Sequence, residues 1–308
     1  MIPKKNEKKK LGQVSFDGKD CWVGVDVHKV NYAVAILDED GQRLEFSTVA
    51  DPKRLLLKLF KMGMRIKVLA YESGPTGYGL AWACQENGIP VVVAAPSRIP
   101  RPVSKTGKTD RLDSMKLAEY LVRDMLKGIA VPSREEFALR EMERARQRLV
   151  KRRRVARQII RSFLLRNGLE EPSGLDSWSA SSIQALRGMP LPVYLRLSLD
   201  SYLEEHATIL AALSTITEEL AKATIEQGHG ERVKNLRSIP GVGVTIAHTF
   251  TSEVFRPERF TRAEDICAYV GLAPTTSHSG SGIARAALAV KNQGRSLSFS
   301  GKSAYIFH

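Results

Sequence analysis

Cysteine, long apolar runs and acidic side chains are all scarce in this sequence. The 308 residues contain three cysteines, at positions 21, 84 and 267. Three are too few for a disulfide framework, and their spacing is not that of a zinc site. No stretch approaches the roughly 18 consecutive apolar residues of a membrane span. The basic N-terminus is not followed by an apolar segment, which argues against a secretory signal. We therefore expect a cytoplasmic protein in a reducing compartment, with no membrane partner.

Acidic residues are outnumbered by basic ones, 33 against 47, which gives a formal net charge of +14. Residues 134–166 carry twelve Arg or Lys against four Glu, and the first ten residues carry five Lys against one Glu. A helix with so many like charges repels itself unless a polyanion neutralises it, so we expect a nucleic-acid partner. The alternative is an ordinary solvated helix face.

The N-terminal half has the pattern of an α/β domain. After a basic disordered tail over 1–19, β-branched runs and turn residues predict a domain over 20–130. Its expected strands are 21–27, 31–37, 43–49, 67–72 and 90–95. Of its three expected helices, the first begins at 51–52, the second ends at about 86 and the third spans 110–125. Three strands followed by alternating helix and strand indicate one mixed sheet covered by helices.

The C-terminal half is expected to be helical. A basic helix over 134–166 and a leucine-striped helix over 193–227 predict an antiparallel hairpin or coiled-coil arm within 131–230. The Gly-, Pro- and Ser-rich stretch 167–192 resembles a linker. Residues 231–308 are expected to form a small, mainly α domain.

Four carboxylates occupy positions suited to a metal ion. Asp26 ends an apolar strand, on the face of Trp22 and Gly24, and Glu72 ends a second one. Asp110 and Asp113 are three residues apart at a helix start and share a face. Hard oxygen ligands suit Mg²⁺, so the set could hold one or two such ions. Alternatively, Asp110 caps its helix and Asp113 is a surface residue.

Two further features suit phosphate binding. Ser238–Ala247 has a helix-hairpin-helix pattern, in which Gly241 and Gly243 permit a tight turn whose amides can face a phosphate, although an ordinary Pro-Gly turn is the alternative. Basic side chains form the second feature. We expect contacts with nucleic-acid phosphates at Arg98, Arg101, Lys105 and Lys108 of a loop and at Arg146, Lys151, Arg152, Arg153, Arg154 and Arg157 of the basic helix.

Three segments together resemble the motifs of DEDD transposases of insertion sequences of the 110 type. They are Gly24-Val-Asp-Val-His-Lys29, Tyr71-Glu-Ser-Gly-Pro-Thr-Gly77 and Lys105-Thr-Gly-Lys-Thr-Asp-Arg-Leu-Asp113. The resemblance implies a RuvC-like, RNase H-type N-terminal domain with Asp26, Glu72, Asp110 and Asp113 as catalytic, metal-binding carboxylates.

The segment Tyr269-Val-Gly-Leu-Ala-Pro-Thr-Thr-Ser-His-Ser-Gly280 is similar to the part of the same family that carries a nucleophilic serine. The match points to Ser279, with Ser277 and Ser281 as rivals; His278 could be a base or a phosphate ligand. The motif resemblance covers about residues 20–280. Beyond Gly280 the sequence departs from the family pattern, so we expect a truncated or altered C-terminus.

The resemblance implies a DNA transposase or recombinase that uses Mg²⁺ and a C-terminal serine to cut and rejoin strands. Its expected partners are element-end and target DNA, a structured non-coding RNA and further copies of the chain in a homodimer or homotetramer. We expect nucleoid association in a bacterium or archaeon. A RuvC-like junction nuclease without serine chemistry and an inactive nucleic-acid-binding remnant are the alternatives.

Overall fold

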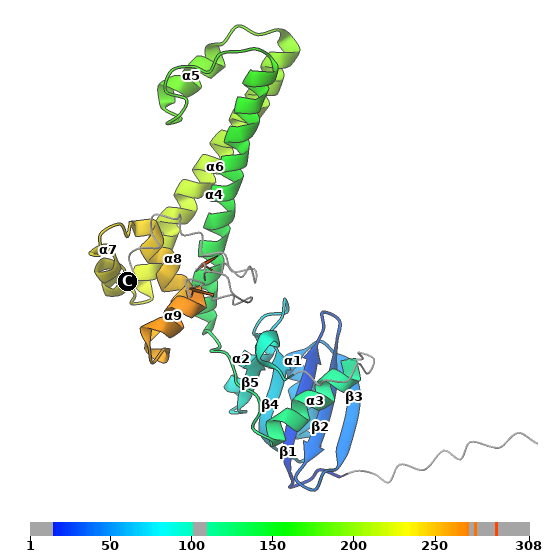
Figure 1. Cartoon of the computed structure of the whole chain (residues 1–308). Coiled ribbons are helices and arrows are strands. Elements are labelled where there is room, and N and C mark those ends of the chain that lie inside the picture. Colours follow the sequence, from blue (N-terminus) through cyan, green and yellow to red (C-terminus); the bar gives the residue numbers. More distant parts are fainter. Residues whose placement is uncertain (1–14, 101–109, 271–273, 276–286, 289–308) are drawn as a thin grey trace, which may run out of the picture. The chain divides into compact units, whose positions relative to one another are not determined.

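Figure 1 shows the chain, whose structure is a computed structural model that describes residues 15–100, 110–270, 274–275 and 287–288. The chain divides into two compact units, residues 1–133 and residues 134–308. Each unit is described by itself. No helix in the described part of the chain is long and apolar enough to cross a membrane.

The first unit is a five-stranded mixed sheet with helices on both faces. Its strand order is β3-β2-β1-β4-β5, in which β1, β2 and β3 pair antiparallel and β4 and β5 run parallel to β1. The elements are β1 (Asp20–Val27), β2 (Asn31–Asp38), β3 (Arg43–Val49), α1 (Pro52–Phe60), β4 (Arg65–Glu72), α2 (Gly79–Glu86), β5 (Val91–Ala94), the short 3-10 helix η1 (Pro96–Arg98) and α3 (Asp110–Val122). The predicted mixed sheet is thus confirmed.

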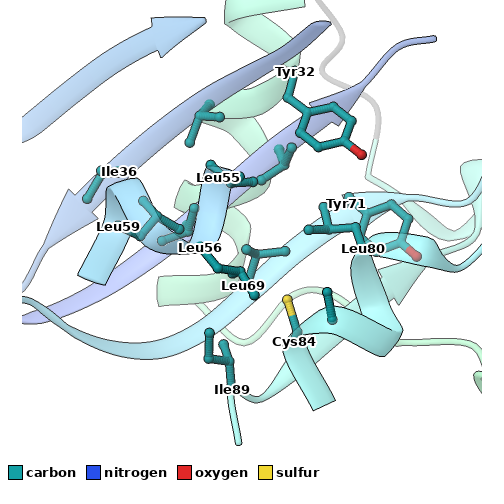
Figure 2. Close-up of a cluster of buried hydrophobic side chains, with 14 of the residues drawn as sticks. Tyr32, Ile36, Leu55, Leu56, Leu59, Leu69, Tyr71, Leu80, Cys84 and Ile89 are labelled. Atoms are coloured by element: carbon teal, nitrogen blue, oxygen red, sulfur yellow. The ribbon is translucent and has the colours of Figure 1, made fainter. Parts of the chain in front are cut away.

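Each face of the sheet has its own apolar core. The larger core lies between the sheet and helices α1 and α2, where Leu55, Leu59 and Tyr71 are fully buried (Figure 2). Helix α3 covers the other face, where Leu117 packs in a second core with Trp22. The alternation predicted for β1 is confirmed, because its odd-numbered residues up to 25 enter the first core and Trp22 the second.

The ordered domain begins earlier than the sequence indicated. The Phe16 side chain is only 2% exposed and belongs to the larger core. The Gly18 amide donates to the carbonyl of Gly63 at 2.9 Å. The predicted tail over 1–19 therefore extends too far, since a buried aromatic ring anchors its last residues.

The second unit is helical. Its two longest helices, α4 (Arg134–Arg166) and α6 (Val193–Glu226), pack side by side. The remaining elements are α5 (Ala180–Gly188), α7 (Gly230–Arg237), α8 (Val244–Val254), the 3-10 helix η2 (Pro257–Arg259), α9 (Ala263–Val270) and the strand pair β6 (Pro274–Thr275) and β7 (Ala287–Leu288).

The stretch predicted as a linker is folded. Within 167–192, helix α5 brings Leu186 into a core with Phe163 of α4 and Leu203 of α6. Leu175 is 1% exposed in the same core. The serine and glycine content of this stretch led to the linker prediction. Two buried leucines are nevertheless enough to dock a short segment against two long helices.

Buried charges join α4 to α8. The Glu143 carboxylate is fully buried and accepts two hydrogen bonds from Arg146, at 2.8 and 2.7 Å. It also accepts a hydrogen bond from the Thr249 hydroxyl of α8. Arg144 donates to both oxygens of Glu253, at 2.9 and 3.2 Å. These bonds require one alignment of the two helices, because a shift would leave charges buried without partners.

Candidate active site and nucleic-acid interface

Two of the predicted carboxylates end neighbouring parallel strands. The register between β1 and β4 pairs Val25 with Tyr71, so Asp26 and Glu72 are the next residues on each strand. Both lie on the face covered by α3, because Trp22 and Ala70, at even positions of the same strands, enter the core beneath that helix. Parallel pairing therefore brings the two carboxylates to one edge of the sheet.

Helix α3 brings a third carboxylate to this face. A Cβ atom added to Gly24 would collide with the Ser114 carbonyl oxygen and would lie 2.7 Å from the Ala118 nitrogen. Glycine is thus what allows the helix backbone to lie directly on β1. Farther along α3, Glu119 pairs with Arg43, which lies across β2 from Trp22 of β1, so the start of the helix, with Asp113, lies toward the end of β1 that carries Asp26. Asp113 also forms an ion pair with Lys116 at 3.6 Å.

The fourth carboxylate is placed through its backbone only. Asp110 is the first residue of α3, one turn before Asp113, and its side chain lies outside the described part. Among the described residues, no three His, Cys, Asp or Glu side chains already form a metal-binding group. The donor chemistry nevertheless fits Mg²⁺, because every predicted ligand offers hard carboxylate oxygens.

Sequence reasoning assigned no role to His28, whose ring contacts the site. Its Nε2 lies 3.1 Å from Oδ2 of Asp26. The backbone amide of His28 donates to the carbonyl of Asn31 at 3.1 Å, which closes the turn between β1 and β2. Alternation along the chain could have revealed the contact, because residues 26 and 28 fall on the same face.

The predicted basic helix presents its cations unequally. Lys151, Arg152 and Arg154 are exposed, and Arg153 is half-buried. Arg152 lies 3.9 Å from Glu205 of α6, a distance typical of a weak surface ion pair. We call these four predicted cations the exposed basic surface of α4; Arg148, to which no role was assigned, is exposed as well.

Two other cations predicted to bind nucleic acid are engaged within the protein. Both guanidinium groups have internal partners. That of Arg146 is buried against Glu143, as described above. Arg157 stacks over the Trp178 ring at 4.9 Å and donates from Nε to Nε2 of His206 at 3.2 Å. Neither side chain is therefore retained in the basic surface.

The neutral state of His206 suits this arrangement. Its ring is 2% exposed. Burial is the main cause that lowers the pKa of His206, and the positive charges of Arg157 and Arg153 lower it further. A neutral ring can accept the Arg157 hydrogen bond, whereas a protonated ring could not.

The turn between α7 and α8 leaves the N-terminal end of α8 without a side-chain cap. Gly241 has a φ of 86°, and Gly243 precedes α8 without any side-chain hydrogen bond that caps the helix. Both glycines are exposed, as is Val244. Free amides at a helix start attract anions, so this turn can accept a phosphate.

Several predicted site residues cannot be placed. Arg98 ends η1, and only its backbone is described. The loop cations Arg101, Lys105 and Lys108 lie outside the described residues, as do Ser277, His278, Ser279 and Ser281. Their roles stay predictions.

Comparison with protein families gives two matches along the chain. Residues 23–167 match a profile of DEDD transposases of the IS110 type, described as a transposase. Residues 233–296 match the profile of the transposase IS116/IS110/IS902 family. The second match continues past Gly280 to residue 296, so the family resemblance extends further than the expected 20–280; a truncated or altered C-terminus stays a prediction.

Individual relatives carry the same description. The chain is 29% identical over 275 residues to y4qE of Sinorhizobium fredii, whose name describes a transposase; the alignment covers 87% of this chain and 67% of the relative. It is 26% identical to the transposase for insertion sequence element IS1533 from Leptospira borgpetersenii, over 78% of this chain and 71% of the relative. It is 23% identical to the IS1328 transposase of Yersinia enterocolitica, over 84% and 75%.

A solved structure aligns with part of the chain. RuvC of Thermus thermophilus covers 35% of this chain and 99% of its own, at 14% identity and a TM-score of 0.22.

Proposed function

Because this chain belongs to the DEDD transposase family of IS110-type insertion sequences, we propose that it cuts and rejoins DNA strands by Mg²⁺-dependent phosphoryl transfer. The observation that carries this proposal is the placement of Asp26 and Glu72 on adjacent parallel strands beneath α3. That geometry supports a RuvC-like domain in which carboxylates from three elements meet at one edge of the sheet.

In this proposal the metal-binding residues are Asp26, Glu72, Asp110 and Asp113. A bound Mg²⁺ would stabilise negative charge on the phosphoryl oxygens and lower the pKa of a coordinated hydroxyl. The chain's own contribution is to fix the carboxylates before the ion binds. Pairing of β1 with β4 fixes the first two, and the close contact of α3 with Gly24 fixes the helix that carries the others.

We further propose Ser279 as the nucleophile, supported by the motif around it and by the family match over 233–296. In-line attack of the Ser279 oxygen on a DNA phosphorus would form a phosphoserine linkage and break one phosphodiester bond. The serine proton would pass to a base, and the leaving strand would depart with a free hydroxyl after protonation. Attack by that or another hydroxyl reverses the exchange and rejoins a strand.

Nucleic acid would contact two surfaces of the second unit. The turn between α7 and α8 supports a helix-hairpin-helix role, because Gly241 and Gly243 leave amides open to a DNA phosphate. The exposed basic surface of α4, defined by Lys151, Arg152, Arg153 and Arg154, supports contact with a structured guide RNA. Helices α4 and α6 would form a coiled-coil arm that joins subunits of a homodimer or homotetramer.

The deciding experiment is strand exchange on element-end and target DNA with the cognate RNA and Mg²⁺. We expect Asp26→Ala to abolish exchange and Ser279→Ala to abolish both exchange and the covalent protein–DNA adduct seen on a denaturing gel. Glu45→Ala is the matched control, because Glu45 is an exposed carboxylate on the edge strand β3.

The other outcomes separate the alternatives. Metal-dependent cleavage that persists in Ser279→Ala without an adduct would indicate a junction nuclease. Salt-sensitive DNA binding without turnover at any Mg²⁺ concentration would indicate an inactive binding protein. Full exchange in Asp26→Ala would refute the carboxylate site.

A further inference from the structure

Arg259, the last residue of η2, is surrounded by aromatic rings. Its Cζ lies 4.7 Å from the ring centroid of Phe255, 4.3 Å from that of Phe260 and 4.6 Å from that of Tyr269. Tyr269 belongs to α9 and donates from its hydroxyl to the carbonyl of Glu253, at 3.2 Å, which ties the ring to α8. The guanidinium is therefore held in place by side chains from α8's end, η2 and α9.

Arg259 differs from the neighbouring arginines in having no acidic partner within the described residues. Arg256 pairs with Glu136 at 2.9 Å. Arg262 lies 3.6 Å from Glu264. Nε and Nη2 of Arg259, in contrast, are buried and lack any hydrogen-bond partner in the described part.

The rings account for the orientation of Arg259 but not for its charge. Burying an N–H donor costs less free energy when it faces an aromatic ring than when it faces no partner. The three rings can therefore accommodate Nε and Nη2, two of the three guanidinium nitrogens. Nη1 is not among the buried, unpartnered atoms, and the residue is half-buried. Through this nitrogen the guanidinium presents its positive charge, for which no carboxylate of the described part lies within ion-pair distance.

The position of Arg259 in the chain suggests which anion its guanidinium binds. Arg259 lies between α8, whose first turn follows Gly241 and Gly243, and α9, after which the chain leads to Ser279. A phosphodiester provides the oxygens that a preoriented guanidinium binds well. We propose that Arg259 binds a phosphate of the DNA strand that this unit engages, and that the three rings hold it ready for that contact.

This inference rests on the proposed function, since it assumes that the second unit binds DNA. The competing explanation is that Arg259 only holds α8, η2 and α9 together. The two explanations differ in the salt dependence of DNA binding. Each phosphate contact contributes roughly 0.9 to the slope of log association constant against log salt on duplex DNA, and a purely structural side chain contributes none.

The test uses the full chain and a fluorescent mixed-sequence DNA duplex over a range of salt concentrations. Arg259→Met keeps an apolar stem among the rings and removes the charge. We expect its salt slope to be shallower than that of the wild type by roughly one. Arg262→Met is the matched control, because Arg262 is exposed and already paired with Glu264; we expect it to change the slope by much less than Arg259→Met.

Hydrogen exchange over α8 and α9 checks folding in the same samples. If Arg259→Met loses protection there, the salt slope of DNA binding is measured on Arg259→Gln instead. That variant also removes the charge but keeps a polar group among the three rings. A wild-type slope in the folded, uncharged variant would overturn the inference. Wild-type protein that binds DNA without salt dependence would overturn the proposed DNA contact itself, and the inference with it. The inference would also be overturned if the uncharged variant had a shallower salt slope on a structured RNA probe but an unchanged slope on the DNA duplex.

Discussion

The contact between α3 and β1 at Gly24 offers a quantitative test of how the carboxylate site is built. In Gly24→Ala the new Cβ would lie 2.7 Å from the Ala118 nitrogen and 3.1 Å from the Leu117 Cβ, and it would collide with the Ser114 carbonyl oxygen. Two of these three atoms belong to the helix backbone and cannot rotate away. Helix α3 must therefore move outward by roughly 1 Å to restore ordinary van der Waals separation.

That displacement has an energetic and a catalytic consequence. Overpacking against side chains costs typically about 1–3 kcal/mol, and contact with backbone places Gly24→Ala near the upper end, at about 3 kcal/mol. Asp113 would move with the helix, away from Asp26. Because a misplacement of about 1 Å at a catalytic group can cost roughly a hundredfold in rate, we expect strand exchange to fall accordingly.

Hydrogen exchange measured by mass spectrometry in the full chain reports the local stability of β1 and α3. A loss of about 3 kcal/mol corresponds to roughly a hundredfold faster exchange wherever these amides exchange through the same opening. Gly79→Ala is the matched control, because a Cβ there meets nothing within 4 Å and the backbone φ is not positive. Protection in Gly24→Ala that equals the control would refute the idea that glycine is required for this contact.

Two further predictions concern buried titratable side chains in the second unit. Glu143→Ala leaves the Arg146 guanidinium buried without its carboxylate, and we expect the free energy of unfolding, measured in urea, to fall by about 3–5 kcal/mol. The control is Glu141→Ala, which removes a side chain that is 42% exposed and should cost less than about 1 kcal/mol. Equal effects of the two substitutions would contradict this prediction. Burial and nearby arginines lower the pKa of His206 below its ordinary 6.5, so in acid the unfolded chain binds more protons at this residue than the folded chain does. The stability that His206 contributes should therefore be full above pH 6.5 and decline as the pH falls through the lowered value. Thermal unfolding of His206→Gln over the same pH range should show less of this decline.

Much of the local structure follows from the sequence. Strand β3 has the bounds 43–49 that the sequence predicted, and α4 has the predicted bounds 134–166. Helix α1 begins where it was predicted, at 51–52, because the Asp51 side chain accepts hydrogen bonds from the backbone amides of Lys53 and Arg54. These features depend on neighbours within a few residues, which the sequence displays directly.

The candidate site was only partly accessible to such reasoning. Residue type and strand ends pointed to Asp26 and Glu72, and the family motifs to Ser279. Their side-by-side placement, however, depends on the parallel pairing of β1 with β4, which are separated in the chain by two strands and a helix. No local periodicity reports a pairing between strands that far apart.

The basic helix shows the same division most clearly. The sequence by itself determined that residues 134–166 form a helix with an excess of positive charge. Only the tertiary structure decided which cations are available, because Arg146 is buried in its ion pair with Glu143, which Thr249 of α8 also binds, and Arg157 stacks on Trp178. The physical reason is that charge is a property of a residue, whereas its availability depends on what the fold packs against it.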